Sequence, residues 1–126
     1  QHWRQRDPDR PELAARFAEV LDRVDGDWKL LVELVESFRL DAPKVLGHLT
    51  TAANFSQVTG VSDWSHRLRG SVSIFGDSPL VAELRQIEEL TRRGLEIPHD
   101  RIRHLPESID RLFGELDLLL SQAPPN

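Results

Sequence analysis

Hydrophobic residues recur every three to four positions along most of the chain, which is the spacing of amphipathic helices. The first such stripe spans residues 13–24, and Asp27 behind it is the expected N-cap of the next helix. The second stripe spans residues 28–49 and contains Pro43, so either one long helix is kinked there or a new helix starts at this proline. The polar and small residues 50–56 are expected to form a connection.

The helical pattern continues through the rest of the chain. A third stripe spans residues 58–75, and a turn follows it, with Ser78 as the expected N-cap and Pro79 as the first residue of the next helix. The fourth stripe spans residues 80–94, and one last helix is expected over residues 98–120. Short connections between four substantial helices predict an all-α fold, an antiparallel four-helix bundle with an additional short N-terminal helix.

The composition narrows the class of protein. The chain has 126 residues, enough for one domain, and its 16 Lys and Arg against 21 Asp and Glu give a formal net charge of −5. It contains no cysteine, which excludes disulfides, thiolate metal sites and cysteine nucleophiles. No apolar stretch approaches the length of a membrane span, and a mildly acidic chain argues against a nucleic-acid binder.

Three segments are expected along the chain. They are an N-terminal arm at residues 1–10, the helical bundle at residues 11–121 and a frayed tail at residues 122–126. The first residue is Gln1 rather than Met, which favours a piece of a longer protein.

The third stripe carries a polar face whose residue types point to chemistry. With Leu68 at the centre of the buried side, His66 and Gly70 each fall about 160° away and Ser73 about 140° away. His66 is therefore expected to point to water, with Arg69 at the edge of the same face.

Gly70 and Arg69 indicate that the exposed histidine has a chemical role. A glycine inside a helix costs about 1 kcal/mol relative to alanine, so Gly70 on an exposed face needs a reason other than packing. A missing side chain one turn after His66 lets another molecule approach the imidazole. Arg69 adds a permanent positive charge suited to an anionic group, although an exposed charge contributes little to folding. Together these features suit phosphoryl transfer.

The run from His66 to Gly76 resembles the signature of histidine-containing phosphotransfer (Hpt) domains. In that signature the His is followed by any one residue, then an aliphatic residue, Lys or Arg, Gly and a small residue, with a second Gly ten residues after the His. The matching positions are His66, Leu68, Arg69, Gly70, Ser71 and Gly76. The likeness extends to residues 27–43 and 84–89. Arg69 stands where the family more often has Lys, which keeps the charge and changes its reach.

The resemblance implies a four-helix bundle in which His66 accepts a phosphoryl group from an aspartyl phosphate on a receiver domain and passes it to another receiver. It implies that Arg69 offsets charge on the transferred group, and that Arg67, Gly70 and Ser73 form the docking face for the receiver. It also implies no kinase activity of its own, and the chain has no glycine-rich phosphate loop. Mg²⁺ is expected in the partner receiver, with no metal or cofactor in this domain.

The expected setting follows from the same resemblance. We expect a cytoplasmic monomer that contacts receiver domains and neither nucleic acid nor membrane. A place within a hybrid sensor histidine kinase and a free-standing phosphotransfer protein are both compatible with the sequence.

Glu88 is the candidate partner for His66. It lies one turn after Leu84, about 40° from the apolar centre of the fourth stripe, at the edge of the side that faces the bundle. From there a carboxylate can accept a hydrogen bond from Nδ1 of His66 and leave Nε2 free to attack phosphorus. The alternative is a partly buried glutamate that extends to water and has no role at the site.

Two other functions stay open on the sequence. One is the phosphoacceptor dimerisation helix of a sensor histidine kinase, but Arg67 stands where such sites have an acidic residue, and the chain has no room for an ATP-binding domain. The other is a helical docking module without phosphotransfer, which the intact His66, Arg69 and Gly70 disfavour.

Overall fold

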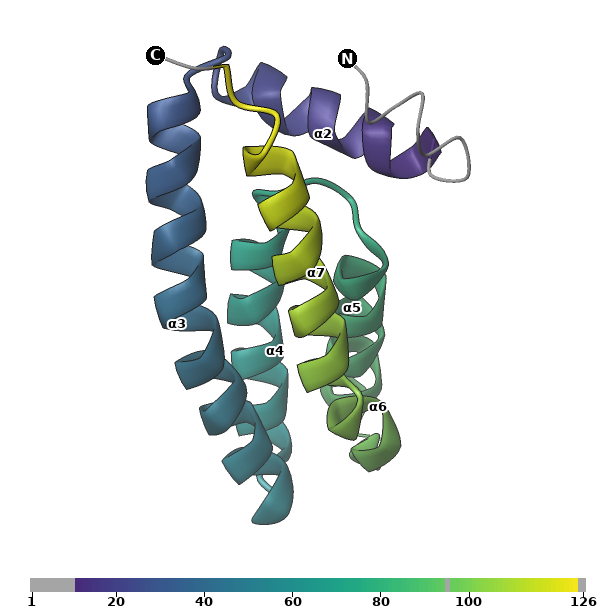
Figure 1. Cartoon of the computed structure of the whole chain (residues 1–126). Helices are drawn as coiled ribbons and strands as arrows, with labels where there is room; N and C mark the ends of the chain where they lie inside the picture. The colour runs from purple at the N-terminus through teal and green to yellow at the C-terminus, as the bar shows by residue number, and fades with distance from the viewer. Residues whose placement is uncertain (1–10, 95, 125–126) are drawn as a thin grey trace.

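The computed structural model describes residues 11–94 and 96–124, and all regular structure in these ranges is helical. The all-α class is therefore confirmed for the described residues. Figure 1 shows α3, α4, α5 and α7 side by side, with α2 across one end and the short α6 at the other. The helices are α2 (Pro11–Arg23), α3 (Trp28–Asn54), α4 (Val58–Ser73), α5 (Pro79–Arg92), α6 (His99–Arg103) and α7 (Leu105–Leu120).

The expected terminal segments fall mostly beyond these helices. The arm expected at residues 1–10 lies outside the described residues, and so do residues 125–126 of the expected tail. Within the described ranges, no helix combines the length and the hydropathy that a membrane crossing needs.

α3 is one continuous helix that passes through Pro43, so no second helix begins there. Asp27 is its N-cap, as predicted, and the Asp27 carboxylate accepts a hydrogen bond from the backbone N–H of Leu30 at 3.0 Å.

The connection predicted at residues 50–56 is largely wrong, because α3 continues to Asn54. Ala52 and Ala53 in this stretch are buried, and alanine is the best helix former. A Cβ on Gly60 of α4 would lie 3.0 Å from the Cβ of Ala52. Small residues thus let α3 and α4 approach each other closely where the chain turns.

The hydrophobic core lies between the helices and includes α2. Phe38 of α3 packs against Phe75, with ring centroids 5.2 Å apart, and against Phe113 of α7, with centroids 5.5 Å apart. α2 adds three buried side chains to the same core, Leu13, Phe17 and Val20. The N-terminal helix is therefore part of the packed structure.

The turn between α4 and α5 follows the sequence prediction. Gly76 has a φ of +93°, a backbone conformation that residues other than glycine rarely adopt. Ser78 occupies the N-cap position and Pro79 the first turn of α5, although the Ser78 hydroxyl makes no capping hydrogen bond. This turn brings α5, and with it Glu88, alongside α4.

The single helix predicted over residues 98–120 is wrong, because His104 separates α6 from α7. Pro106 supplies the reason. Proline has no N–H and its ring clashes with the preceding turn, so it fits the first turn of a helix but not the interior.

Candidate functional site

α4 presents His66 to solvent and buries its opposite side. Leu68 and Val72 are completely buried, whereas the side chain of His66 is 71% exposed. Ser65 is also completely buried, so the core-facing side of α4 includes a serine that the hydrophobic pattern does not show. The direction of the imidazole is set by a regular helix on a packed core rather than by a loop.

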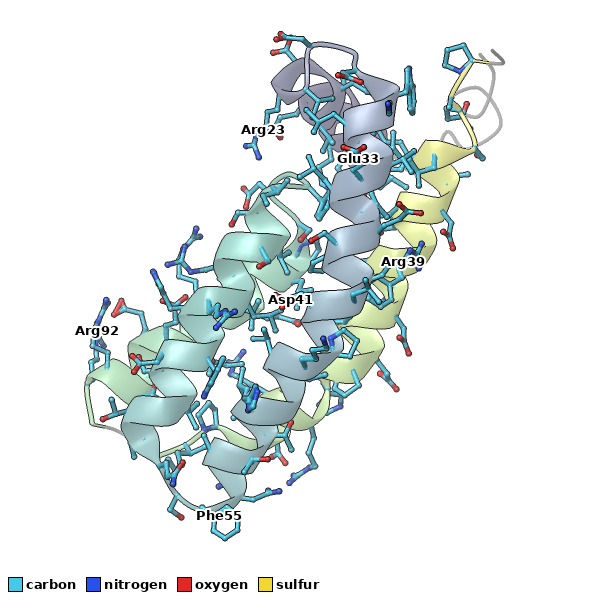
Figure 2. The ribbon with its side chains drawn as sticks, turned by 90° about the vertical axis from the view of Figure 1, so that its left-hand side faces the viewer. Arg23, Glu33, Arg39, Asp41, Phe55 and Arg92 are labelled. Carbon is cyan, nitrogen blue, oxygen red and sulfur yellow. The ribbon has the colours of Figure 1, made fainter. Side chains whose placement is uncertain are left out.

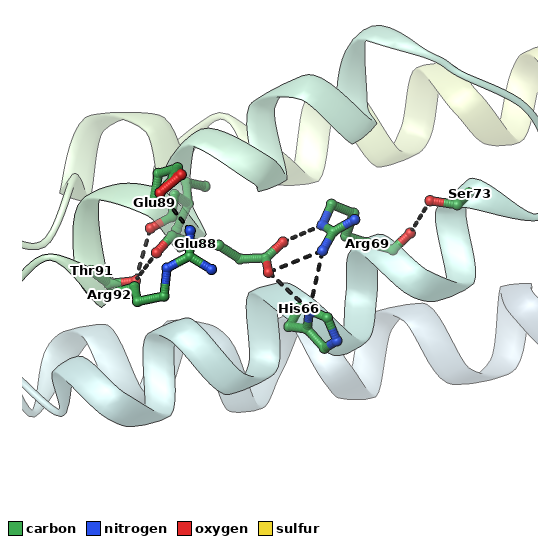
Figure 3. Close-up of polar contacts among 8 residues, drawn as sticks. His66, Arg69, Ser73, Glu88, Glu89, Thr91 and Arg92 are labelled. Carbon is green, nitrogen blue, oxygen red and sulfur yellow. Dashed lines mark hydrogen bonds and ion pairs between the residues drawn. The ribbon is translucent and has the colours of Figure 1, made fainter.

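Glu88 reaches from α5 to His66 (Figure 3). Its Oε1 lies 2.9 Å from Nδ1 of His66, and its side chain is only 10% exposed. The contact expected from the helical geometry is therefore present. That the contact orients the ring for catalysis stays a prediction.

Arg69 also binds Glu88, which the sequence did not predict. Its Nε donates to Oε2 of Glu88, and its Nη2 donates to Oε1 at 3.2 Å. The same Nη2 lies 3.2 Å from Nδ1 of His66, and Figure 3 shows the three side chains meeting between α4 and α5. The guanidinium is thus turned toward Glu88, on the Nδ1 side of the imidazole.

The carboxylate of Glu88 selects the tautomer of His66. Without a proton on Nδ1, the ring lone pair would face a carboxylate oxygen at 2.9 Å, which is repulsive. With a proton there, Oε1 accepts from both Nδ1–H and the Nη2–H of Arg69, and Oε2 accepts from Nε–H. The lone pair of His66 is then on Nε2, which has no hydrogen-bond partner among residues 11–94 and 96–124.

Opposing effects set the charge of Glu88. Burial raises its pKa, but the hydrogen bonds from Arg69 and His66, together with the charge of Arg69, outweigh burial and leave the pKa lowered. The hydrogen bond to Glu88 in turn raises the pKa of Arg69. Glu88 is therefore ionised at neutral pH and can accept a hydrogen bond from Nδ1–H of His66.

This pairing predicts a pH-dependent stability. Arg69 is only 25% exposed and holds a buried carboxylate, so it is not the freely exposed charge that the sequence predicted. We expect Arg69→Ala to lower the free energy of unfolding by about 1–3 kcal/mol at pH 7. Since folding lowers the pKa of Glu88, the stabilisation is present above the ordinary carboxyl range and disappears as the pH falls through the lowered value. Urea unfolding at several pH values measures both effects.

Arg92→Ala is the matched control for this prediction. Its ion pair with Glu89 spans 2.5 Å but joins two exposed side chains, so the variant should change the stability by less than about 1 kcal/mol. If the decrease in the free energy of unfolding of Arg69→Ala stays constant from neutral to acidic pH, the effect comes from packing rather than from the ion pair.

The three residues predicted to form a docking face differ in how open they are. A Cβ on Gly70 would meet no neighbouring atom within 4 Å. Arg67 is exposed, and its guanidinium carbon lies 5.4 Å from the ring centroid of Trp64. Ser73 is half-buried, and its hydroxyl donates to the backbone oxygen of Arg69 at 2.7 Å. Gly70 and Arg67 are thus accessible, whereas Ser73 is bonded within its own helix.

The arrangement matches a known family. A family model described as the Hpt domain matches residues 33–115, which include all of α3 after its first turn, α4 and α5. The chain belongs to the Hpt domain family. Hpt domains carry out histidine phosphotransfer in phosphorelays and interact with receiver domains. His66, Arg69 and Glu88 of this Hpt domain all lie in the matched range, whereas α2 precedes it. Neither the curated proteins nor the solved structures that were compared include a match to it.

Proposed function

We propose that this Hpt domain is a relay intermediate between two receivers. His66 accepts a phosphoryl group from the aspartyl phosphate of one receiver domain and passes it to an aspartate of another. The observation that carries the proposal is the exposed imidazole of His66, whose Nδ1 is held by the buried carboxylate of Glu88. Exposure lets another protein reach the ring, and the fixed orientation removes rotational freedom before the reaction.

The chemistry needs little beyond this alignment. The lone pair of Nε2 attacks phosphorus, the bond from phosphorus to the aspartyl oxygen breaks, and the electron pair leaves with the aspartate as a carboxylate. The ring gains positive charge as the N–P bond forms, and the carboxylate of Glu88 stabilises that charge through Nδ1–H. The second transfer runs the same steps in reverse, with a new aspartate as the attacking group.

Arg69 has two roles in this proposal. Its hydrogen bonds hold Glu88 in place and keep it ionised, and its positive charge, one helical turn from His66, offsets charge on the transferred group. Mg²⁺ bound by the receiver supplies further neutralisation during the transfer.

The wider setting is part of the same proposal. α3, α4, α5 and α7 act as an antiparallel four-helix phosphotransfer bundle, and α2 is an addition to it. The domain works as a cytoplasmic monomer without kinase activity, and Arg67 and Gly70 lie in its contact with the receiver.

A two-step transfer assay tests the relay. Receiver domains are phosphorylated with acetyl phosphate, freed from it and incubated one by one with the domain. At least one should give the domain a label that is lost in acid and stable in base, as phosphohistidine is. The re-isolated labelled domain should then phosphorylate a different receiver. A domain that takes label from no receiver, or passes it to no second one, contradicts the relay.

Glu88 should affect the chemical step and not the docking. We expect Glu88→Ala to lower the transfer rate at saturating receiver, with the half-saturating concentration nearly unchanged. A hydrogen bond to a charged group is worth about 1.5–3 kcal/mol, which corresponds to roughly a tenfold to hundredfold lower rate. Glu88→Gln keeps an acceptor oxygen for Nδ1–H but loses the negative charge, so it should transfer faster than Glu88→Ala and more slowly than the wild type. A wild-type rate in Glu88→Ala would show that His66 orients itself without this contact.

A further inference from the structure

α2 lies outside the range that the family model matches, yet it is bonded to the helix that carries His66. Nη1 of Arg23 donates to the backbone oxygen of Ser73 at 2.6 Å and to that of Ile74 at 3.4 Å. These carbonyls are at the C-terminal end of α4, where the helix dipole favours a positive charge. Nη2 of Arg23 pairs with Glu19 of its own helix at 2.6 Å. Figure 2 shows Arg23 reaching from α2 toward the turn between α4 and α5.

A pocket opens beside this contact. It has a volume of about 150 Å³ and is formed by α2, α4, α5 and the turn between the last two, through Arg23, Ser73, Gly76, Asp77, Val81 and Arg85. Its charged lining residues are two arginines and one aspartate, and the charge of Arg23 is paired with Glu19. Arg85 is exposed, and in the described part of the chain it forms no hydrogen bond or ion pair. Its charge is therefore available to another molecule.

The pocket adjoins the imidazole. Ser73 follows His66 by seven residues, so it lies about 10 Å further along α4 on nearly the same face. Arg85 precedes Glu88 by one helical turn. Glu88 contacts His66 while Arg85 shares the pocket with Ser73, so the residue numbers of α4 and α5 rise in opposite directions along this surface.

A receiver that brings its aspartate to His66 has to cover this pocket. A stable protein–protein interface buries about 800 Å² on each partner, which is a disc of about 16 Å radius. The pocket lies inside such a disc centred on His66. The aspartyl phosphate that such a receiver presents is itself anionic, so acidic side chains next to it would complement the positive charge of Arg85.

We propose that this pocket binds an acidic side chain of the receiver, close to its phosphorylated aspartate. Arg85 is then a docking residue, and α2 contributes to receiver recognition through Arg23. The inference rests on the proposed function, because it assigns a contact to the partner of the same site. Arg69 is a weaker candidate for this contact, since its Nε and Nη2 both donate to Glu88 and turn the guanidinium toward that carboxylate. Arg23 is fixed by the carbonyls of α4, so the charge that is free to pair is that of Arg85.

The test measures transfer against the concentration of each receiver that phosphorylates the wild-type domain, at low and at high salt. Arg85→Glu should raise the half-saturating concentration about fivefold to tenfold at low salt and leave the saturated rate unchanged. Most of the difference should disappear at high salt. Arg85→Gln and Arg23→Gln should each give a smaller rise. Labelling of His66 by phosphoramidate, a small donor that needs no docking, should be the same in all variants.

Arg101→Glu is the matched control. It changes the net charge equally and is exposed on α6, at the opposite end of the molecule from α2 (Figure 1), so the half-saturating concentration should not change. If the half-saturating concentration of Arg85→Glu equals that of the wild type, the docking proposal is overturned and the relay is unaffected. If the half-saturating concentration of Arg23→Gln is unchanged, the role of α2 is overturned. If Arg85→Glu also slows labelling by phosphoramidate, Arg85 acts on the site itself and the docking proposal fails. A wild-type domain that no receiver phosphorylates overturns both the relay and the docking contact.

Discussion

Replacing His66 by Gln will abolish the acid-labile, base-stable label that the wild-type domain takes from phosphorylated receivers. Glutamine has no ring nitrogen with a free lone pair, so no N–P bond can form. The fold should be unaffected, because the side chain is 71% exposed and the glutamine amide can still donate to Glu88. The measurement is labelling by receivers and by phosphoramidate, together with a thermal melt that should match that of the wild type.

His104→Gln is the control for this variant. His104 is also exposed, but it lies between α6 and α7, and its Nδ1 is 2.7 Å from the backbone oxygen of Asp100. The His104→Gln variant should be labelled to the same level as the wild-type domain. A label that persists in His66→Gln, or one that resists acid, would place the phosphoryl group on another residue.

Gly70→Leu should give a folded, slightly more stable domain that receivers no longer phosphorylate efficiently. Glycine inside a helix costs about 1 kcal/mol relative to alanine, and a Cβ here would meet no neighbouring atom within 4 Å. The new side chain would cover the approach to His66 one turn away. Displacing the reacting groups by about 1 Å costs roughly a hundredfold in rate, so transfer from receivers should fall at least that far. Transfer rates and urea unfolding curves measure the two effects.

Gly114→Leu separates the effect on approach from the effect on the helix. Gly114 is likewise exposed inside a helix, with no neighbouring atom within 4 Å of an added Cβ, but it lies on α7. This variant should be stabilised to a similar extent and should transfer normally. Normal transfer in a folded Gly70→Leu domain would show that the open position beside His66 has no steric role.

The helical class could be predicted because each helix must bury one apolar stripe, and the stripe is visible in the sequence. The ends of the helices were harder. α3 continues through residues 50–54 because Ala52 and Ala53 are buried, with Ala52 next to Gly60 of α4, and the single sequence does not show that partner. The break at His104 had a visible cause in Pro106, which the continuous hydrophobic pattern obscured.

The site was predictable where it depends on one helix at a time. The exposure of His66 follows from its angle on α4, and Glu88 lies at the edge of α5 that faces the adjacent helix. The pairing of Arg69 with Glu88 was missed, because the helical wheel gives the face of a residue but not the offset of one helix along the other. The opposite charges at facing edges of consecutive helices were the signal that could have found it.

Because α2 is packed on the bundle, it belongs to the smallest segment of this chain that can be transferred to another protein as a folded domain. The family match starts at residue 33, which is an obvious place to cut this domain out of the chain. A module cut there would leave behind the three apolar side chains of α2 and open one end of the core to water. It would also remove Arg23 from the last carbonyls of the helix that bears His66. A chimera built from this protein should therefore begin no later than Pro11.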